Sequence, residues 1–313
     1  MILKKICEII GVSGYENRIT DYIMDLLNKR ENVYKDNVGN LIYYKKGTCS
    51  KNKIMIMAHV DEVGFQITKK IDENKFKFKI LGNVKTWNSN NQKVIFSNGS
   101  RGVIFSEDES NISLNDFDNM YLFSLDDTIN IGDTFTFFDE FMESDNFYIG
   151  KGLDNRICCY LMVKSILEDT CTVNDVFFVF SVQEEIGMRG AKVAISHIQP
   201  DIVLCLDVSP VCKNNNIDLE NGVAIKISDS IGVSNPDLVN NIEKIAEKNN
   251  IKYQLEVSDC GTSELIMINE IDMGSKNVGL SLPCLFMHTP NVIVNKEDVN
   301  NMYELILKIL ENV

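Results

Sequence analysis

Two adjacent carboxylates, Glu184 and Glu185, come just after the apolar run at residues 176–180. The run predicts a buried strand, which would place both glutamates at its end. Neighbouring residues of a strand point to opposite faces, so both can face one site only if the strand ends before them, as Gly187 just beyond would permit. Two carboxylates at the edge of a core are unfavourable unless a positive group neutralises them. The alternative is an exposed loop.

A histidine and an aspartate occur at the end of another apolar run. His59 follows the run at residues 53–58, and Asp61 comes two residues later. Side chains two apart on an extended chain share a face, so Asp61 can hold the second ring nitrogen of His59. Metal-bound histidines favour such a partner. A histidine that only completes a strand end is the alternative.

Three further candidates follow the same pattern. Asp154 and Asn155 precede a predicted helix, where either could instead be the N-cap. Asp207 follows the apolar strand at residues 202–206, and His288 ends another apolar run. The third histidine, His197, lies between a predicted helix and a proline, and we interpret it as structural.

Apart from Asp61, the expected partner of His59, these positions supply two histidines, two aspartates and two glutamates, all but Asp154 at predicted strand ends. In open α/β sheets the strand ends converge on a ligand-binding crevice. Imidazole and carboxylate ligands suit Zn²⁺, Co²⁺ or Mn²⁺ rather than a thiolate site. The set is large enough for two divalent ions that share one carboxylate, with one carboxylate left as a base.

Helical periodicity alternates with apolar strand-like runs at both ends of the chain. Helices are expected at residues 2–10, 16–28, 154–167, from about 189, from 236, at 262–268 and at 296–310. Strands are expected at residues 32–35, 40–44, 53–58, 175–182, 202–206, 222–227, 252–257 and 277–283. This alternation predicts an α/β fold with a mainly parallel mixed sheet flanked by helices.

The middle of the chain has a different sequence pattern. Residues 66–147 contain short β-rich segments separated by Asn, Asp and Gly, with no good long helix. We therefore expect a small inserted β-barrel-like domain at 66–147, within a catalytic domain made of residues 1–65 and 148–313.

Composition excludes several classes of protein. The net charge of −14 over 313 residues argues against nucleic-acid binding, which needs a basic face. The nine cysteines include no CxxC pair, and cysteines such as Cys205 and Cys284, which lie inside apolar runs, are interpreted as core residues in a reducing compartment. No signal peptide or membrane span is recognisable, so a cytoplasmic protein is expected. Nucleophile-elbow, phosphate-loop and H-E-x-x-H motifs are absent from the sequence.

Five stretches resemble, in order, the conserved blocks of the M42 metallo-aminopeptidases, the glutamyl and tetrahedral aminopeptidase group. They are AHVDEVGF, GKGLDNR, QEEIGMRGA, LDVSP and HTP, which run from Ala58 to Pro290. The inserted β segment matches the family's inserted domain in position. The resemblance implies a phosphorylase/hydrolase-like metallopeptidase domain, and an insert that serves oligomerisation or substrate access.

The resemblance also implies a role for each residue. Asp154 would bridge both metals, His59 and Glu185 would complete one site, and Asp207 and His288 the other. Glu184 would be the general base and Asp61 the partner of His59. A non-proline cis peptide bond after Asp154 is implied as well. Three departures stand out: Asn155 and Ser263 each replace an expected aspartate, and the insert is shorter and lacks the family's helical excursion.

The expected activity is removal of N-terminal residues from short peptides, with a metal-bridging water as nucleophile and Glu184 as base. Two divalent ions per subunit are expected, Zn²⁺ or Co²⁺ before Mn²⁺. The resemblance implies a homo-oligomer, a dodecamer built from dimers. A glycoside hydrolase that uses the glutamate pair is one alternative, although it would leave His59, Asp207 and His288 without a role. A non-catalytic peptide-binding relative is the other.

Overall fold

The computed structural model describes residues 1–27, 30–107, 117–259, 261, 263–265 and 274–313. Its larger part, the body, is built on an 11-stranded mixed sheet. Nine of the strands follow the order β1 (Val33–Lys35), β2 (Leu41–Lys45), β12 (Asp175–Ser181), β3 (Lys53–His59), β13 (Ile202–Pro210), β16 (Lys276–Leu285), β17 (Ile293–Asn295), β11 (Phe147–Ile149) and β10 (Met142–Glu143). Off this path, β14 (Val223–Ser228) pairs with β15 (Tyr253–Val257) and with β16.

The four central strands, β12, β3, β13 and β16, run parallel to one another. Each is an almost continuous apolar run, as expected for strands covered on both faces. Along β3, Ile54 and Ile56 pack into the larger core and Met55 and Met57 into a smaller core on the opposite face. The parallel direction matters for the site, because the carboxyl ends of all four strands meet at one edge of the sheet.

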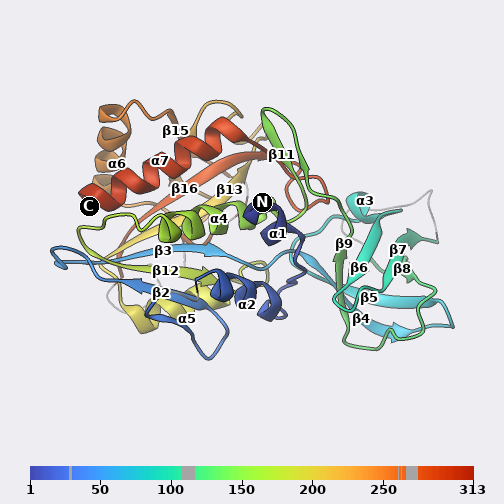
Figure 1. Ribbon diagram of the computed structural model, residues 1–313. Helices are drawn as coiled ribbons and strands as arrows, with labels where there is room; N and C mark the ends of the chain where they lie inside the picture. The colour runs from blue at the N-terminus through green and yellow to red at the C-terminus, as the bar shows by residue number, and fades with distance from the viewer. Residues whose placement is uncertain (28–29, 108–116, 260, 262, 266–273) are drawn as a thin grey trace.

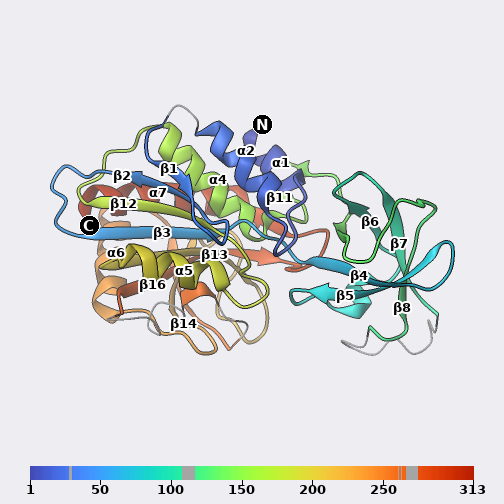
Figure 2. The same cartoon turned by 90° about the horizontal axis from the view of Figure 1, so that it is seen from below.

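Helices cover both faces of the sheet (Figures 1 and 2). The larger core is lined by residues of α1 (Ile2–Glu8), α2 (Asn17–Leu26), α4 (Leu153–Leu167), α6 (Pro236–Lys248) and α7 (Lys296–Asn312). The smaller core lies under α5 (Arg189–Ile198), whose residues Ala191, Ala194, Ile195 and Ile198 pack on the other face. The α/β architecture predicted from the sequence is therefore confirmed.

A closed six-stranded barrel projects from one end of the body (Figures 1 and 2). Its strands, in barrel order, are β4 (Gly64–Lys70), β5 (Lys75–Leu81), β8 (Met120–Phe123), β7 (Arg101–Ser106), β6 (Lys93–Phe96) and β9 (Thr134–Phe137). Aromatic rings fill it: Phe65 stacks on Phe135 at 5.1 Å between ring centroids and meets Phe78 edge-on at 5.2 Å. The barrel's only helix among the described residues is α3 (Thr86–Ser89).

The barrel differs slightly from the expected insert at residues 66–147. Its strands begin at Gly64, because β4 continues almost directly from the end of β3. At the other end, β10 and β11 leave the barrel and join the large sheet through pairing of β11 with β17. Short strands flanked by turns have the same sequence pattern in the barrel and in the large sheet. The sequence therefore did not show that β10 and β11 belong to the large sheet. Most of the helix expected at residues 262–268 lies outside the described residues.

None of the described helices is long and apolar enough to cross a membrane. Cys205 and Cys284 are buried, as expected for core cysteines, whereas Cys49 and Cys171 are exposed. Arg156 is fully buried where α4 meets the N-terminal segment, and it donates to the backbone oxygens of Ile6 (2.8 Å) and Val60 (2.5 Å). These bonds hold the start of α4 against the end of β3, where the site lies.

Candidate functional site

The seven residues predicted for the site all lie at the carboxyl edge of the central strands. His59 is the last residue of β3, and Asp61 follows it. Glu184 and Glu185 follow β12, Asp207 lies within β13, His288 follows β16, and Asp154 lies at the start of α4. Segments almost 230 residues apart in the chain are thus brought together by the parallel arrangement of the strands.

Asp154 lies between the two histidines. Its Oδ1 atom is 3.3 Å from Nε2 of His59, and its Oδ2 atom is 3.3 Å from Nε2 of His288. The two oxygens of one carboxylate therefore face two different imidazoles. This is the arrangement that a carboxylate needs in order to bridge two cations.

The remaining carboxylates surround the same centre. Nε2 of His59 lies 3.8 Å from Oδ1 of Asp207, and Nε2 of His288 lies 3.3 Å from Oε2 of Glu185. Oε2 of Glu184 is 3.9 Å from Nε2 of His59. Among the described residues, no lysine or arginine lies within ion-pair distance of these carboxylates.

Three overlapping groups have all their ligand atoms within 4.8 Å of one another. They are His59, Asp154 and Asp207; Asp154, Glu185 and His288; and His59, Glu184 and Glu185. The resemblance implies His59 with Glu185 and Asp207 with His288. The third group contains His59 with Glu185, whereas the first two groups place Asp207 with His59 and Glu185 with His288. The reason is the sheet order: β13 lies directly beside β3, while the turn after β12 brings Glu185 across to His288.

Backbone carbonyl oxygens orient both imidazoles. Nδ1 of His59 donates to the carbonyl oxygen of Asp61 at 3.2 Å, and Oδ1 of Asp61 lies 3.5 Å from the same nitrogen. Nδ1 of His288 donates to the carbonyl oxygen of Asn83 at 3.0 Å. Each ring therefore turns Nε2 toward the carboxylates, as metal-binding histidines require. Asp61 thus lies beside His59, with its backbone oxygen accepting the hydrogen bond and its carboxylate slightly farther away.

Asn83 belongs to the turn after β5 of the barrel, so the inserted unit supplies part of the site. The sequence contained no signal for this contact, because it uses a backbone atom and any residue type provides one. The neighbouring Gly82 has φ +94, and a Cβ there would lie 2.7 Å from Val63 and 3.3 Å from Glu185.

The glutamate pair is presented by a sharp change of backbone direction. β12 ends at Ser181, and Gln183 has φ 57, in the left-handed region, just before the pair. Gly187, with φ 118, reverses the chain after it. The residue that lets both glutamates face the site is therefore Gln183 as much as Gly187. A side chain that tolerates this conformation cannot be recognised from residue type alone.

The start of α4 carries two further features. The peptide bond between Asp154 and Asn155 is cis, as the resemblance implied. The Asn155 amide donates to the backbone oxygen of Leu206 at 2.7 Å, next to Asp207. An ionised aspartate at this position has no hydrogen to donate. The asparagine that departs from the family pattern thus joins the two segments that supply Asp154 and Asp207.

Burial and like charge strongly perturb the titration of the site. Burial raises the pKa of Glu184 well above its usual range, with Glu185 and Asp207 adding to the effect. Burial also raises the pKa of Asp207 to about 7, and Asp154 contributes to the shift. Burial opposes charge on His59 and His288 as well, but the surrounding carboxylates outweigh it and raise the pKa of both imidazoles. The buried carboxylates of the site therefore need positive charge nearby to neutralise them.

The donor set fits divalent cations. It offers two imidazole nitrogens and several carboxylate oxygens, which Zn²⁺, Co²⁺ and Mn²⁺ accept. No thiol belongs to any of the three groups. In the absence of an ion, protons on the imidazoles supply the positive charge, and a bound cation would displace them.

These groups open into a cavity of about 440 Å³. Its wall also includes Met188, Lys226, Ser263 and Met287. Lys226, on β14, is buried and is the one lysine or arginine among the described residues that line the cavity; its Nζ lies 3.8 Å from Oε1 of Glu256. The sequence gives no signal for Lys226, because a single lysine in a strand has no distinguishing pattern.

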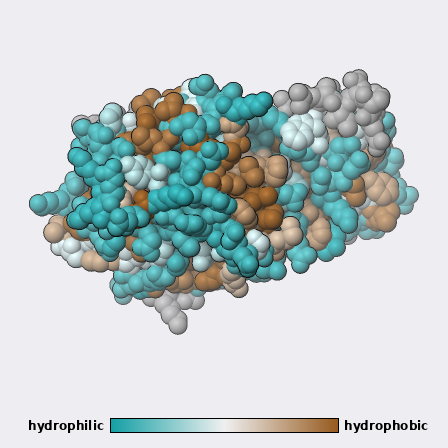
Figure 3. Space-filling view, turned by 90° about the horizontal axis from the view of Figure 1, so that it is seen from above, coloured by the Kyte–Doolittle hydropathy of each residue, from teal (hydrophilic) through white to brown (hydrophobic). Residues whose placement is uncertain are grey.

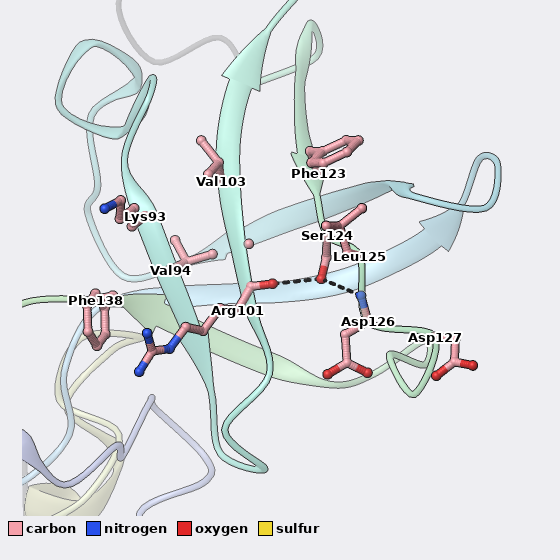
Figure 4. A pocket seen from close by; sticks show the side chains of 11 residues that line it. Lys93, Val94, Arg101, Val103, Phe123, Ser124, Leu125, Asp126, Asp127 and Phe138 are labelled. Atoms are coloured by element: carbon pink, nitrogen blue, oxygen red, sulfur yellow. Dashed lines mark hydrogen bonds between the residues drawn. The ribbon is translucent and has the colours of Figure 1, made fainter.

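A different hollow, of about 720 Å³, lies on the outside of the barrel (Figure 4). Apolar side chains such as Val103, Phe123 and Leu125 dominate it, beside Arg101 and Asp126. It contains no histidine or cysteine, and its carboxylates, Asp126 and Asp127, are adjacent in one loop. The residues that line this larger hollow therefore do not form a metal-binding or catalytic cluster.

Comparisons with known proteins agree with this geometry. The family model described as M42 glutamyl aminopeptidase matches residues 39–305. A curated protein named putative aminopeptidase, from Acetivibrio thermocellus, is 34% identical, over 98% of this chain and 97% of that protein. The chain belongs to the M42 peptidase family.

Solved structures show the same fold over the whole chain. An aminopeptidase from the archaeon Desulfurococcus kamchatkensis has a TM-score of 0.92 at 28% identity, covering 100% of this chain and 94% of that one. The TET1 peptidase of Pyrococcus horikoshii, described as assembling into a tetrahedron or a large octahedral shell, has a TM-score of 0.90 at 26% identity, covering 99% and 98%. A protein from Thermotoga maritima titled an endoglucanase has 0.83 at 26%, covering 99% and 96%.

Proposed function

We propose that this protein is an aminopeptidase with two divalent metal ions, which removes N-terminal residues from short peptides. The observation that carries the proposal is the position of Asp154, whose two oxygens each lie 3.3 Å from a different histidine. Two of the three ligand groups share Asp154, and neither of them includes Glu184. The Glu184 carboxylate lies beside both groups. Membership of a peptidase family supports the same conclusion.

The residues suggest how the site is divided. His59, Asp154 and Asp207 would hold one ion, and Asp154, Glu185 and His288 the other. Two bound ions supply Lewis acidity, which lowers the pKa of a coordinated water and polarises the scissile carbonyl. Zn²⁺ or Co²⁺ would suit this set, as would Mn²⁺.

Glu184 is the proposed general base. Its carboxylate lines the cavity, and burial raises its pKa well above the usual range of a glutamate, which favours acceptance of a proton. Glu184 would take a proton from the attacking water and give it to the amine nitrogen as the peptide bond breaks. The acidic wall would also attract the free amino group of a peptide, which limits cleavage to the first bond.

The decisive experiment uses Glu184→Gln and a panel of aminoacyl substrates. The chain is stripped with a chelator and assayed after addition of Zn²⁺, Co²⁺ or Mn²⁺. Wild type should regain hydrolysis, and the variant should bind both ions but lose activity by at least about 10²-fold. Hydrolysis that persists in the metal-loaded variant would show that Glu184 is not the base.

Two alternatives remain distinguishable. A glycoside hydrolase that uses the glutamate pair needs no transition metal, so activity on glycosides that survives the chelator would favour it. A non-catalytic peptide-binding relative would bind peptides without hydrolysis, and would be favoured if the stripped chain took up no metal. Neither alternative explains why two histidines and Asp207 share the site with the glutamates.

The assembly we propose is a homo-oligomer, and specifically a dodecamer built from dimers. Seen from above, apolar side chains gather on the body beside its junction with the barrel (Figure 3). Leu125 and Ile131 on the barrel are 80% and 69% exposed, and exposed apolar surface of this kind often marks interfaces. Light scattering would detect a particle of twelve 35.5-kDa subunits, and a monomer at working concentration would contradict the assembly.

A further inference from the structure

Four consecutive backbone N–H groups follow the last residue of β12, and side-chain oxygens accept from all of them. The N–H of Val182 donates to Oδ1 of Asn40 at 3.0 Å, and that of Gln183 to Oε1 of Glu16 at 3.0 Å. The N–H groups of Glu184 and Glu185 donate to the two carboxylate oxygens of Asp61 at 3.0 and 3.1 Å. The segment that carries the proposed base is thus held by three side chains from the first 61 residues.

These bonds replace those that the sheet no longer provides. β12 stops pairing at Ser181, and the left-handed backbone of Gln183 turns the chain toward the site. Val182 and Glu184 are buried, while Gln183 and Glu185 are partly exposed, so water has only limited access to this backbone. A buried N–H group without a partner is costly, so the three side chains decide which backbone path is stable.

Glu16 has a particular place among the three. Asn40 acts on Val182, where the chain is only just leaving the sheet, and Asp61 acts on the glutamates themselves. Glu16 holds the N–H of Gln183, the residue whose left-handed conformation redirects the chain. Its Oε1 atom also accepts from the N–H of Gly14 at 2.6 Å, and its side chain is buried.

The segment around Glu16 is itself anchored to the site. The hydroxyl of Ser13 donates to Oδ2 of Asp61 at 2.6 Å. The backbone of Gly11 exchanges hydrogen bonds with Glu62: its N–H donates to Oε1 at 3.0 Å, and its oxygen accepts from the Glu62 N–H at 3.0 Å. Glu16 is therefore attached to the same framework that carries His59 and Asp61, and it can set the distance from that framework to Glu184.

We propose that Glu16 is a positioning residue, which fixes the backbone of Gln183 and thereby the placement of Glu184 and Glu185 against the two histidines. The effect on catalysis rests on the proposed peptidase function. The effect on the backbone does not, since it concerns only the hydrogen bond from Gln183 to Glu16.

The test compares two substitutions in the full-length protein. Glu16→Ala removes the acceptor, whereas Glu16→Gln retains a side-chain oxygen that can accept from Gln183 and Gly14. Thr20→Val is the matched control, because the buried Thr20 hydroxyl bonds to the backbone oxygens of Glu16 and Asn17 at the start of α2 but does not touch Gln183.

Three measurements are needed. Amide hydrogen exchange over residues 182–189 reports the hydrogen bonds directly. The visible absorption of the Co²⁺-loaded protein reports ligand geometry at Glu185 and the histidines. Steady-state kinetics on an aminoacyl substrate separate kcat from KM.

We expect Glu16→Ala to speed exchange over residues 182–189, to change the Co²⁺ spectrum, and to lower kcat about 10–100-fold with KM within about threefold. Glu16→Gln should stay close to wild type in all three measurements, and Thr20→Val should keep kcat and the spectrum.

Unchanged exchange and spectrum in Glu16→Ala would overturn the proposal. Equal losses in Glu16→Gln would also overturn it, because charge rather than hydrogen bonding would then matter. A Thr20→Val variant as impaired as Glu16→Ala would show only general loosening of the helix start. If wild type proves inactive, the proposed function fails, and the exchange measurement still decides whether Glu16 fixes the backbone of Gln183.

Discussion

The carboxylate of Asp61 accepts hydrogen bonds from the backbone N–H groups of both Glu184 and Glu185, at 3.0 and 3.1 Å. The same residue lies beside Nδ1 of His59. Asp61 thus connects the orientation of a proposed metal ligand to the orientation of the proposed base. Its partners can be perturbed one at a time.

Substituting Asp61 by asparagine should lower kcat/KM about 10–100-fold, because residues behind metal ligands commonly have effects of this size. Asp61 accepts from the Ser13 hydroxyl and from two backbone N–H groups, and an asparagine NH₂ group in place of one oxygen would face a donor. Kinetics with metal content measured in parallel test this. Ser13→Ala, which removes one donor and leaves the acceptors, should be milder; a variant D61N as active as wild type would contradict the role of Asp61.

Metal ions should stabilise the folded protein strongly. A ligand that binds only the folded state adds about 2.7 kcal/mol at a hundred times its dissociation constant. Zn²⁺ added to chelator-stripped protein should therefore raise the melting temperature, and Asp154→Ala should abolish most of the rise by removing the shared ligand. His197→Ala, at an exposed position on α5, should retain it. An equal rise in Asp154→Ala would place the ions elsewhere.

Lys226 should favour substrates whose first residue is acidic. It is the one lysine or arginine among the described residues that line the cavity, and a charge-assisted hydrogen bond contributes about 1.5–3 kcal/mol. We expect Lys226→Met to lower kcat/KM for a glutamyl substrate about 10–100-fold relative to a leucyl substrate. The ratio between the substrates cancels any general damage from leaving Glu256 without Lys226. Lys226→Arg should keep the preference, and an unchanged ratio in Lys226→Met would exclude this role.

Glu62 should be a major determinant of stability. It forms buried ion pairs with Lys151 and, at 3.4 Å, with Arg156. Removing one partner of a buried ion pair typically costs about 3–5 kcal/mol, because the other charge stays buried. Glu62→Gln should therefore lower the free energy of unfolding by about this amount in denaturant titrations. Glu311→Gln, which breaks the exposed pair with Lys308, should be close to wild type.

The same ion pairs predict a pH dependence. Burial opposes ionisation of Glu62, but Lys151 and Arg156 outweigh it and hold the pKa below the ordinary value of 4.5. A carboxyl group with a lowered pKa stabilises the fold above its unfolded value, and the contribution is lost as pH falls through the folded-state value. Unfolding free energy should thus fall below about pH 4.5 in wild type and fall less in Glu62→Gln. Parallel pH profiles would contradict this assignment.

The sequence by itself determined the type of fold and the set of candidate ligands. Continuous apolar runs such as residues 53–58 indicated strands covered on both faces, and His59, Asp207 and His288 stood out because each follows or ends such a run. These are local properties: the period of apolar residues and the residue type at a strand end do not depend on distant segments.

Only the tertiary structure decided how the parts act together. The sheet order places Asp207 beside His59 and brings Glu185 to His288, a division that chain order does not contain. The backbone of Asn83, the conformation of Gln183 and the buried Lys226 likewise became visible only in three dimensions. The physical reason is that these contributions come from backbone atoms, dihedral angles and long-range burial, which depend on the packed chain rather than on the residue type.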